Sequence, residues 1–209
     1  MSRRAKWILI LLVVFLVFDA AAVIVITMAR RPSSVATTWK TVTTGRATIG
    51  GPFTLTTADG KIVTDQTYRG KWMLIYFGYT FCPDACPTAL NNIGIALQKL
   101  GKEVDKIQPL FITVDPKRDT REVMSAYLES FDSHIVGLLG TQEQTEAAAK
   151  AYRVYVEPEK SEGDDYLVSH SSYLYLMDLQ GKFVDAISGA TAGDELGDKL
   201  HKLINEHST

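Results

Sequence analysis

The chain has 209 residues and a mass of 23.1 kDa, which allows one domain with an appendage and excludes a large multidomain enzyme. Its apolar share of 46% and charged share of 22% are those of a folded globular protein. Residues 1–31 carry five basic and one acidic side chain, and the remainder carries 17 basic and 23 acidic. Binding to the phosphates of a nucleic acid needs clustered Lys and Arg. The net acidic charge of residues 32–209 therefore excludes nucleic acid as a partner.

The chain begins with a long apolar segment. Residues 7–29 are interrupted only by Asp19, and at about 1.5 Å per residue they can cross a hydrocarbon core of about 30 Å. Basic residues before the segment favour a cytoplasmic N-terminus, residues 1–6. A cleaved signal peptide is the alternative, but the apolar run resumes at Val23, beyond the small residues where cleavage would occur. We therefore predict an uncleaved transmembrane anchor over residues 7–29.

The location follows from the same segment. With a cytoplasmic N-terminus and one span, the rest of the chain lies outside the cytoplasm. No Arg- and Ser-rich amphipathic leader precedes the span, so we predict a bacterial inner membrane rather than mitochondrial import. The expected location is a single-pass protein with its soluble domain in the periplasm.

A linker and one domain follow the anchor. Residues 30–50 are rich in Thr, Ser, Gly and Pro and read as a linker, and residues 51–206 form the predicted domain. Within it, a small β-hairpin is expected around the turn at 58–60, and the continuous apolar run 72–77 predicts a strand buried on both faces. Further strands are predicted over 110–114, 135–139, 173–177 and 183–187.

Helices are expected between these strands. One runs from near Pro87 to Leu100, with apolar residues on one face. Capping boxes predict two more helix starts, and a cap predicts the last helix, which ends near residue 204. These caps are Asp119 with Glu122, Thr141 with Gln144, and Thr191. Buried strands that alternate with helices indicate an α/β domain with a central sheet covered on both faces. The segments 116–118 and 157–165 are expected to be solvent-exposed.

The two cysteines of the chain, Cys82 and Cys86, stand between the most buried strand and the first helix. The end of a strand that leads into a helix is where α/β folds place ligands, and a helix N-terminus favours thiolate over thiol. On one helical turn their Cα atoms would be about 6 Å apart, within disulfide range and also suited to one soft metal ion. Asp84 between them is expected to face water.

Three kinds of site fit this pair. A structural disulfide would close a very short loop and gain little entropy. A redox dithiol usually has the spacing Cys-x-x-Cys, one residue shorter than here. A metal site needs a third ligand, for which His170, just before the strand at 173–177, is the candidate. Two thiolates with an imidazole suit copper better than zinc, which prefers four protein ligands in a structural site. The residues alone leave all three open.

Three segments together resemble a known family. They are CPDACP after the strand and loop WMLIYFGYTF, DPKRDT at 115–120, and YLVSHSSYLYLMD at 166–178. On these the chain resembles the Sco/SenC family over essentially its whole length. That family consists of membrane-anchored copper proteins of thioredoxin-like fold that help to assemble the CuA centre of cytochrome c oxidase. Ser169 departs from the pattern, since many members have Asp beside the histidine.

The resemblance implies a function and a site. It implies a thioredoxin-like domain whose copper ligands are Cys82, Cys86 and His170, and a copper metallochaperone as the function. The implied partners are the CuA-bearing subunit of cytochrome c oxidase and a periplasmic copper donor. The alternative is an enzyme, a thiol–disulfide oxidoreductase that reduces the cysteines of the CuA site. Such enzymes are expected to carry a cis-proline before the strand that faces the cysteines, where this chain has Ser171 and Ser172.

Overall fold

The computed structural model describes residues 49–159 and 166–206. The predicted anchor, most of the linker and most of the acidic segment 157–165 lie outside this part of the chain. Within it, no helix combines the length and the apolar composition that a membrane span requires.

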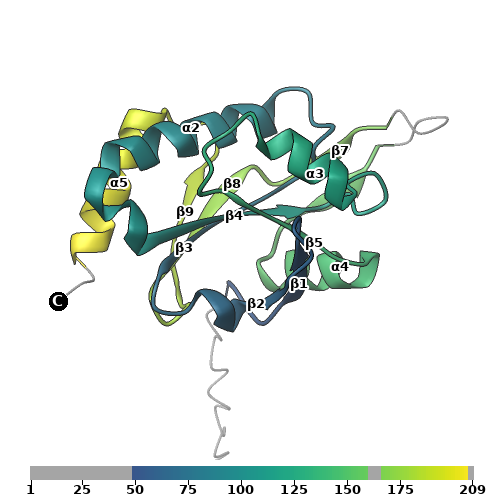
Figure 1. Cartoon of the computed structure of the whole chain (residues 1–209), viewed down its shortest axis with the longest axis horizontal. Coiled ribbons are helices and arrows are strands. Elements are labelled where there is room, and N and C mark those ends of the chain that lie inside the picture. The colour runs from purple at the N-terminus through teal and green to yellow at the C-terminus, as the bar shows by residue number, and fades with distance from the viewer. Residues whose placement is uncertain (1–48, 160–165, 207–209) are drawn as a thin grey trace, which may run out of the picture. The chain divides into compact units, whose positions relative to one another are not determined.

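A seven-stranded mixed sheet forms the centre of the domain (Figure 1). Its spatial order is β2-β1-β5-β4-β3-β8-β9, with β3 parallel to β4 and β4 parallel to β5. Its strands are β1 (Thr54–Thr57), β2 (Ile62–Thr64), β3 (Trp72–Gly78), β4 (Ile107–Thr113), β5 (Val136–Leu139), β8 (Tyr173–Met177) and β9 (Phe183–Ser188). The α/β prediction and its strands, including the hairpin β1–β2, are confirmed, with ends shifted by up to three residues.

Helices and a second small sheet complete the described chain. The helices are α2 (Ala85–Leu100), α3 (Arg121–Leu128), α4 (Gln142–Ala151) and α5 (Gly193–Glu206), with short 3-10 helices η1 (Asp65–Tyr68) and η2 (Gly101–Lys106). The antiparallel pair β6 (Val156–Pro158) and β7 (Val168–His170) forms the second sheet, which the sequence analysis did not predict.

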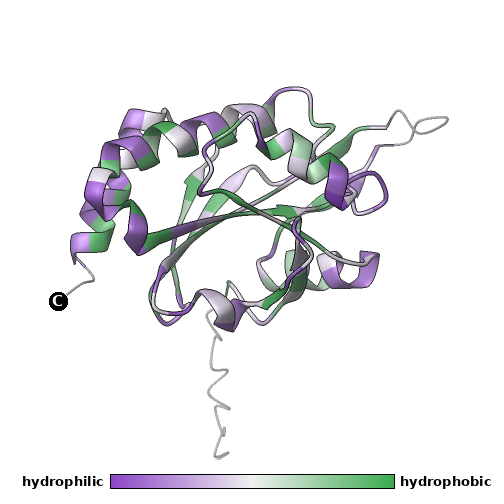
Figure 2. Ribbon diagram, viewed as in Figure 1, coloured by the Kyte–Doolittle hydropathy of each residue, from purple (hydrophilic) through white to green (hydrophobic). Residues whose placement is uncertain are grey.

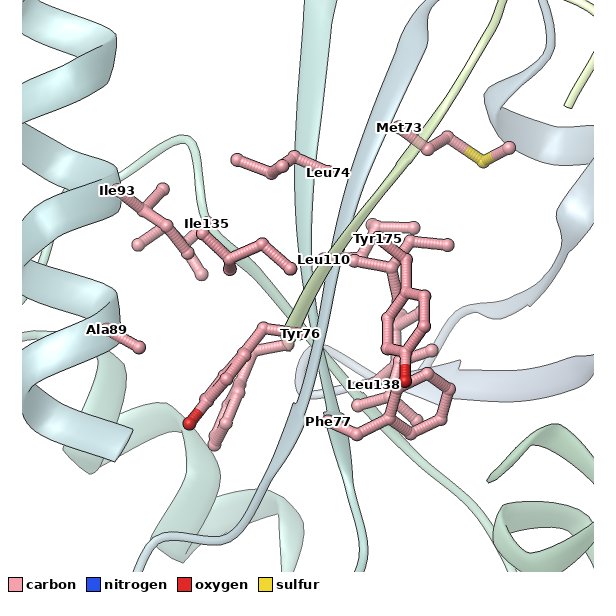
Figure 3. Close-up of a cluster of buried hydrophobic side chains, with 14 of the residues drawn as sticks. Met73, Leu74, Tyr76, Phe77, Ala89, Ile93, Leu110, Ile135, Leu138 and Tyr175 are labelled. Atoms are coloured by element: carbon pink, nitrogen blue, oxygen red, sulfur yellow. The ribbon is translucent and has the colours of Figure 1, made fainter. Parts of the chain in front are cut away.

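The core lies on both faces of β3, as the sequence predicts. Every residue of β3 is buried, so its apolar run has no solvent-facing side. Figure 3 shows Leu74 and Tyr76 on the side of α2, near Ala89 and Ile93, with Met73 on the opposite side. Figure 2 shows the same partition, with hydrophobic residues along the central strands and hydrophilic ones on the outer faces of the helices. Burial on both faces holds β3 rigidly, and the segment that follows it starts from a fixed point.

Two predicted helix starts are wrong. The cap of α3 is Thr120, whose Oγ1 accepts from the N–H of Val123 at 3.3 Å, because Asp119 turns inward instead. The last helix begins at Gly193, two residues after Thr191. The capping box of Thr141 and Gln144 is confirmed. The prediction that residues 116–118 are solvent-exposed is wrong at Arg118, because its side chain is only 11% exposed.

Strand register brings three distant segments to one edge of the sheet. Gly78 at the end of β3 lies opposite Thr113 at the end of the parallel strand β4. Tyr76 pairs with Leu174 of the antiparallel strand β8, so the residues just before β8 reach the same edge. The loop with the cysteines, the loop after β4 and the segment around His170 therefore meet there, where open α/β sheets bind ligands.

Candidate metal centre

The cysteines lie where β3 passes into α2. This helix begins at Ala85, close to the start predicted near Pro87, so Cys86 lies in its first turn and is fully buried. Cys82 lies outside the helix and is partly exposed. The backbone N–H groups in the first turn of a helix have no carbonyl partner within the helix. The N–H of Cys86 is one of them, and it donates to Cys82 Sγ at 3.4 Å. The start of the helix therefore supplies a donor to the more accessible sulfur.

His170 is the last residue of β7, a strand that the sequence analysis did not predict. It pairs with Val156 across the small sheet. The ring Nδ1 lies 3.2 Å from the carbonyl oxygen of Ser171, and because a carbonyl can only accept, Nδ1 carries the proton. In the neutral ring, Nε2 then has a free lone pair, and it lies 3.5 Å from Cys86 Sγ. The hydroxyl of Ser169, the residue that departs from the family pattern, donates to Glu159 at 2.9 Å.

The three residues predicted from sequence meet in the structure. Cys82 Sγ, Cys86 Sγ and one ring nitrogen of His170 all lie within 4.8 Å of one another. They are the only group of at least three Cys, His, Asp or Glu residues in residues 49–159 and 166–206 placed to share a metal ion. Two sulfurs and an imidazole nitrogen are a soft donor set, and both cysteines are free.

The two thiols differ in acidity. A hydrogen bond from the Cys86 thiol, with further ones from the backbone N–H groups of Asp84 and Cys86, lowers the pKa of Cys82 to about 4 against the opposing effect of burial. The pKa of Cys86 is raised, because its thiol donates to Cys82 and because it is buried. Of the two sulfurs, the accessible one is thus the thiolate and the buried one keeps its proton in the reduced protein.

Residues not anticipated from sequence shape the site. The hydroxyl of Tyr76 donates to Cys86 Sγ at 4.0 Å and pairs with Ser172 Oγ at 3.1 Å. A Cβ on Gly78 would stand 2.8 Å from Cys86 Sγ, so only glycine leaves room for that thiol. Tyr79 meets the His170 ring edge-on, with centroids 5.9 Å apart. Tyrosines and a glycine in or next to an apolar strand look like core residues, and only the tertiary structure reveals that they line the site.

The fold and the site define a class of protein: an α/β domain with a dithiol and an imidazole at the edge of its sheet, able to bind a soft metal or to exchange disulfides. The chain belongs to the SCO1/SenC family, whose model matches residues 41–205.

Solved structures agree with this assignment. The chain is similar to Bradyrhizobium japonicum ScoI with copper bound, at 43% identity and a TM-score of 0.70, covering 74% of this chain and 99% of that one. It is also similar to yeast Sco1 with copper bound, at 40% identity and a TM-score of 0.71, covering 77% of this chain and 90% of that one. The predicted thioredoxin-like fold is thereby confirmed.

The curated relatives correct the predicted location. The chain is 44% identical over 166 residues to the mitochondrial SCO1 homologue of Mus musculus, which is 78% of this chain and 58% of that protein. Relatives from Arabidopsis thaliana and Saccharomyces cerevisiae are also named as mitochondrial proteins. The predicted location, a single-pass protein of the bacterial inner membrane with a periplasmic domain, is wrong by this comparison. It rested on the first 29 residues, which lie outside the described part. The chain spans about half to three-fifths of the length of its curated relatives.

Proposed function

We propose that this chain is a copper metallochaperone that binds one copper ion through Cys82, Cys86 and His170. The observation that carries the proposal is the convergence of two sulfurs and an imidazole nitrogen within 4.8 Å, in a family whose solved members include copper-bound structures. Thiolate sulfur is the ligand that Cu(I) prefers, and imidazole suits both oxidation states.

The site also suits release of its cargo. Cys82 is already a thiolate, so metal entry has to displace a proton only from Cys86. Exchange with a disulfide of another protein, which takes up the two electrons and two protons and becomes two thiols, would convert Cys82 and Cys86 to a disulfide. Both sulfurs would then leave the donor set, which releases the copper. We propose the CuA-bearing subunit of cytochrome c oxidase as recipient, in keeping with the family resemblance, with a separate copper donor upstream. The apolar segment 7–29 is the proposed membrane anchor of this function.

The second candidate is a thiol–disulfide oxidoreductase, favoured by the acidic, partly exposed thiol of Cys82. Its thiolate would attack one sulfur of a target disulfide and form a mixed disulfide, with the other target sulfur leaving as a thiolate that takes up a proton. Cys86 would then lose its proton and attack Cys82 Sγ, releasing the second target sulfur. The two electrons lost by the pair reduce the target. This reaction does not need His170.

One comparison separates the two candidates. The full chain is reduced without oxygen and titrated with Cu(I) against a competing chelator, as wild type and as His170→Ala. The metallochaperone requires one tightly bound copper per chain and a loss of at least about tenfold in affinity in the variant, the scale expected for losing one ligand interaction. If the wild type binds no copper above the chelator, while Cys82 and Cys86 form a reversible disulfide indifferent to His170→Ala, the oxidoreductase is the better assignment.

A further inference from the structure

Arg118 lies at the junction of the segments that carry the proposed copper ligands. It belongs to the turn after β4, and its side chain is 11% exposed although the turn itself is on the surface. Its Nε donates to Asp115, whose side chain is only 4% exposed. A buried guanidinium paired with a buried carboxylate is costly to assemble, so an ordinary exposed turn does not account for it.

Aromatic rings from two other segments cover the guanidinium. The carbon Cζ of Arg118 lies 3.7 Å from the ring centroid of Tyr166 and 4.8 Å from that of Phe81. Tyr79 is a third ring, at 5.6 Å. Cations at such distances from ring faces are attracted by them, and a planar guanidinium also stacks on them. Arg118 thus contacts residues nearly 40 positions before it and nearly 50 positions after it.

Each of these rings leads directly to a ligand. Phe81 immediately precedes Cys82, and Tyr166 lies two residues before the strand β7, which ends at His170. Tyr79 contacts the His170 ring edge-on and its hydroxyl accepts from the N–H of Val168, also in β7. Contacts around one side chain therefore set the position of the cysteine loop relative to the strand of the histidine.

The carboxylates of the same turn reinforce the junction. Asp115 accepts from the hydroxyl of Tyr166 at 2.7 Å as well as from Arg118. Asp119 accepts from the N–H of Thr80, at 3.2 Å, and from its hydroxyl, at 2.6 Å. The turn after β4 is thus bonded to the cysteine loop at one end and to the segment before β7 at the other, with Arg118 between them.

We propose that Arg118 is a positioning residue for the metal centre, which holds the imidazole of His170 against the two thiols by joining the Cys82 loop to the strand β7. It touches none of the ligand atoms and acts through Phe81, Tyr79 and Tyr166. The inference rests on the proposed function because its main test measures copper affinity.

The test is a double-mutant cycle on the full chain. Cu(I) affinity is measured for wild type, Arg118→Ala, His170→Ala and the double variant. If Arg118 acts by placing His170, Arg118→Ala loses at least about tenfold in affinity, and the double variant is no more than about twofold weaker than His170→Ala alone. Arg118→Lys, which keeps the charge but not the planar stacking group, recovers little. The matched control is Arg121→Ala, an exposed arginine of α3 that donates to the carbonyl of Ala58.

Two outcomes overturn the proposal. One is a Cu(I) affinity of Arg118→Ala equal to that of the wild type. The other is a double variant whose fold-loss of affinity equals the product of the two single fold-losses, because Arg118 would then act independently of His170. If Arg118→Ala does not fold, Tyr166→Leu removes the ring nearest to the guanidinium and takes its place in the cycle.

A copper-free measurement separates this proposal from the function on which it rests. In the reduced apo protein, nuclear Overhauser contacts between the rings of Tyr79 and His170 are present in wild type and in Arg121→Ala, and are lost in Arg118→Ala. If the wild type binds no copper, the proposed function fails while this measurement still decides the role of Arg118. Persistence of the contacts in Arg118→Ala contradicts the proposal whether or not copper binds.

Discussion

Replacing Gly78 by alanine tests how closely the sheet is fitted to the sulfurs. The added Cβ would stand 2.7 Å from the Phe111 ring and 2.8 Å from Cys86 Sγ. Non-bonded carbons settle at about 3.5–4.0 Å, so the neighbours must yield by roughly 0.8 Å. Gly78 is the last residue of a strand buried on both faces, so the backbone has little room to move away.

The expected loss has two parts. Overpacking of this size costs about 1–3 kcal/mol of unfolding free energy. Metal–ligand distances tolerate only about 0.2 Å, so a displaced Cys86 thiol lowers Cu(I) affinity at least about tenfold, or ~1.4 kcal/mol. Denaturant unfolding of the apo protein measures the first part, and competition titration measures the second.

Gly137 provides the matched control. A Cβ there would stand 2.6 Å from Met124 and 2.7 Å from Leu128, a similar clash in the core without any cysteine nearby. Gly137→Ala should therefore lose stability comparably and keep its copper affinity within about twofold of wild type. The reasoning is refuted if Gly78→Ala binds copper like wild type, or if both variants weaken binding equally, which would trace the effect to general destabilisation.

Three further variants or measurements follow from the site. The alkylation rate of Cys82 in the reduced apo protein should stay within about twofold between pH 5.5 and 8, since its pKa is about 4; a tenfold rise per pH unit, as for an ordinary thiol, would contradict that. Tyr76→Phe withdraws a donor from Cys86, so the disulfide potential measured in redox buffers should fall by about 20 mV, and an unchanged or higher potential would exclude this donor role. Asp119→Ala should lower the free energy of unfolding in urea by about 2–3 kcal/mol, because Thr80 loses its acceptor. Glu122→Ala should lower it by less than about 1 kcal/mol. Equal losses in the two variants would favour the capping box of Asp119 and Glu122.

Local patterns were sufficient for most of the fold. The continuous apolar run of β3 marks a strand buried on both faces, because any solvent-facing side would have brought polar residues at every second position. The capping box of Thr141 and Gln144 is equally local, since both of its hydrogen bonds close within four residues. Cys82, Cys86 and His170 were also singled out from sequence, through residue types and the family resemblance, and their role as copper ligands stays a prediction.

Tertiary structure decided what depends on distant partners. Asp119 and Glu122 satisfy the capping pattern, yet Asp119 turns inward because two threonines of neighbouring strands and loops offer it better donors. Arg118 looks like a surface residue until the cysteine loop and the segment before β7 are folded over it. The short sheet that carries His170 has little pattern of its own, because three-residue strands are too short to show alternation. Sequence alone thus determines which residues have the chemistry to bind copper, whereas strand register and packing between distant segments determine that the three meet within 4.8 Å.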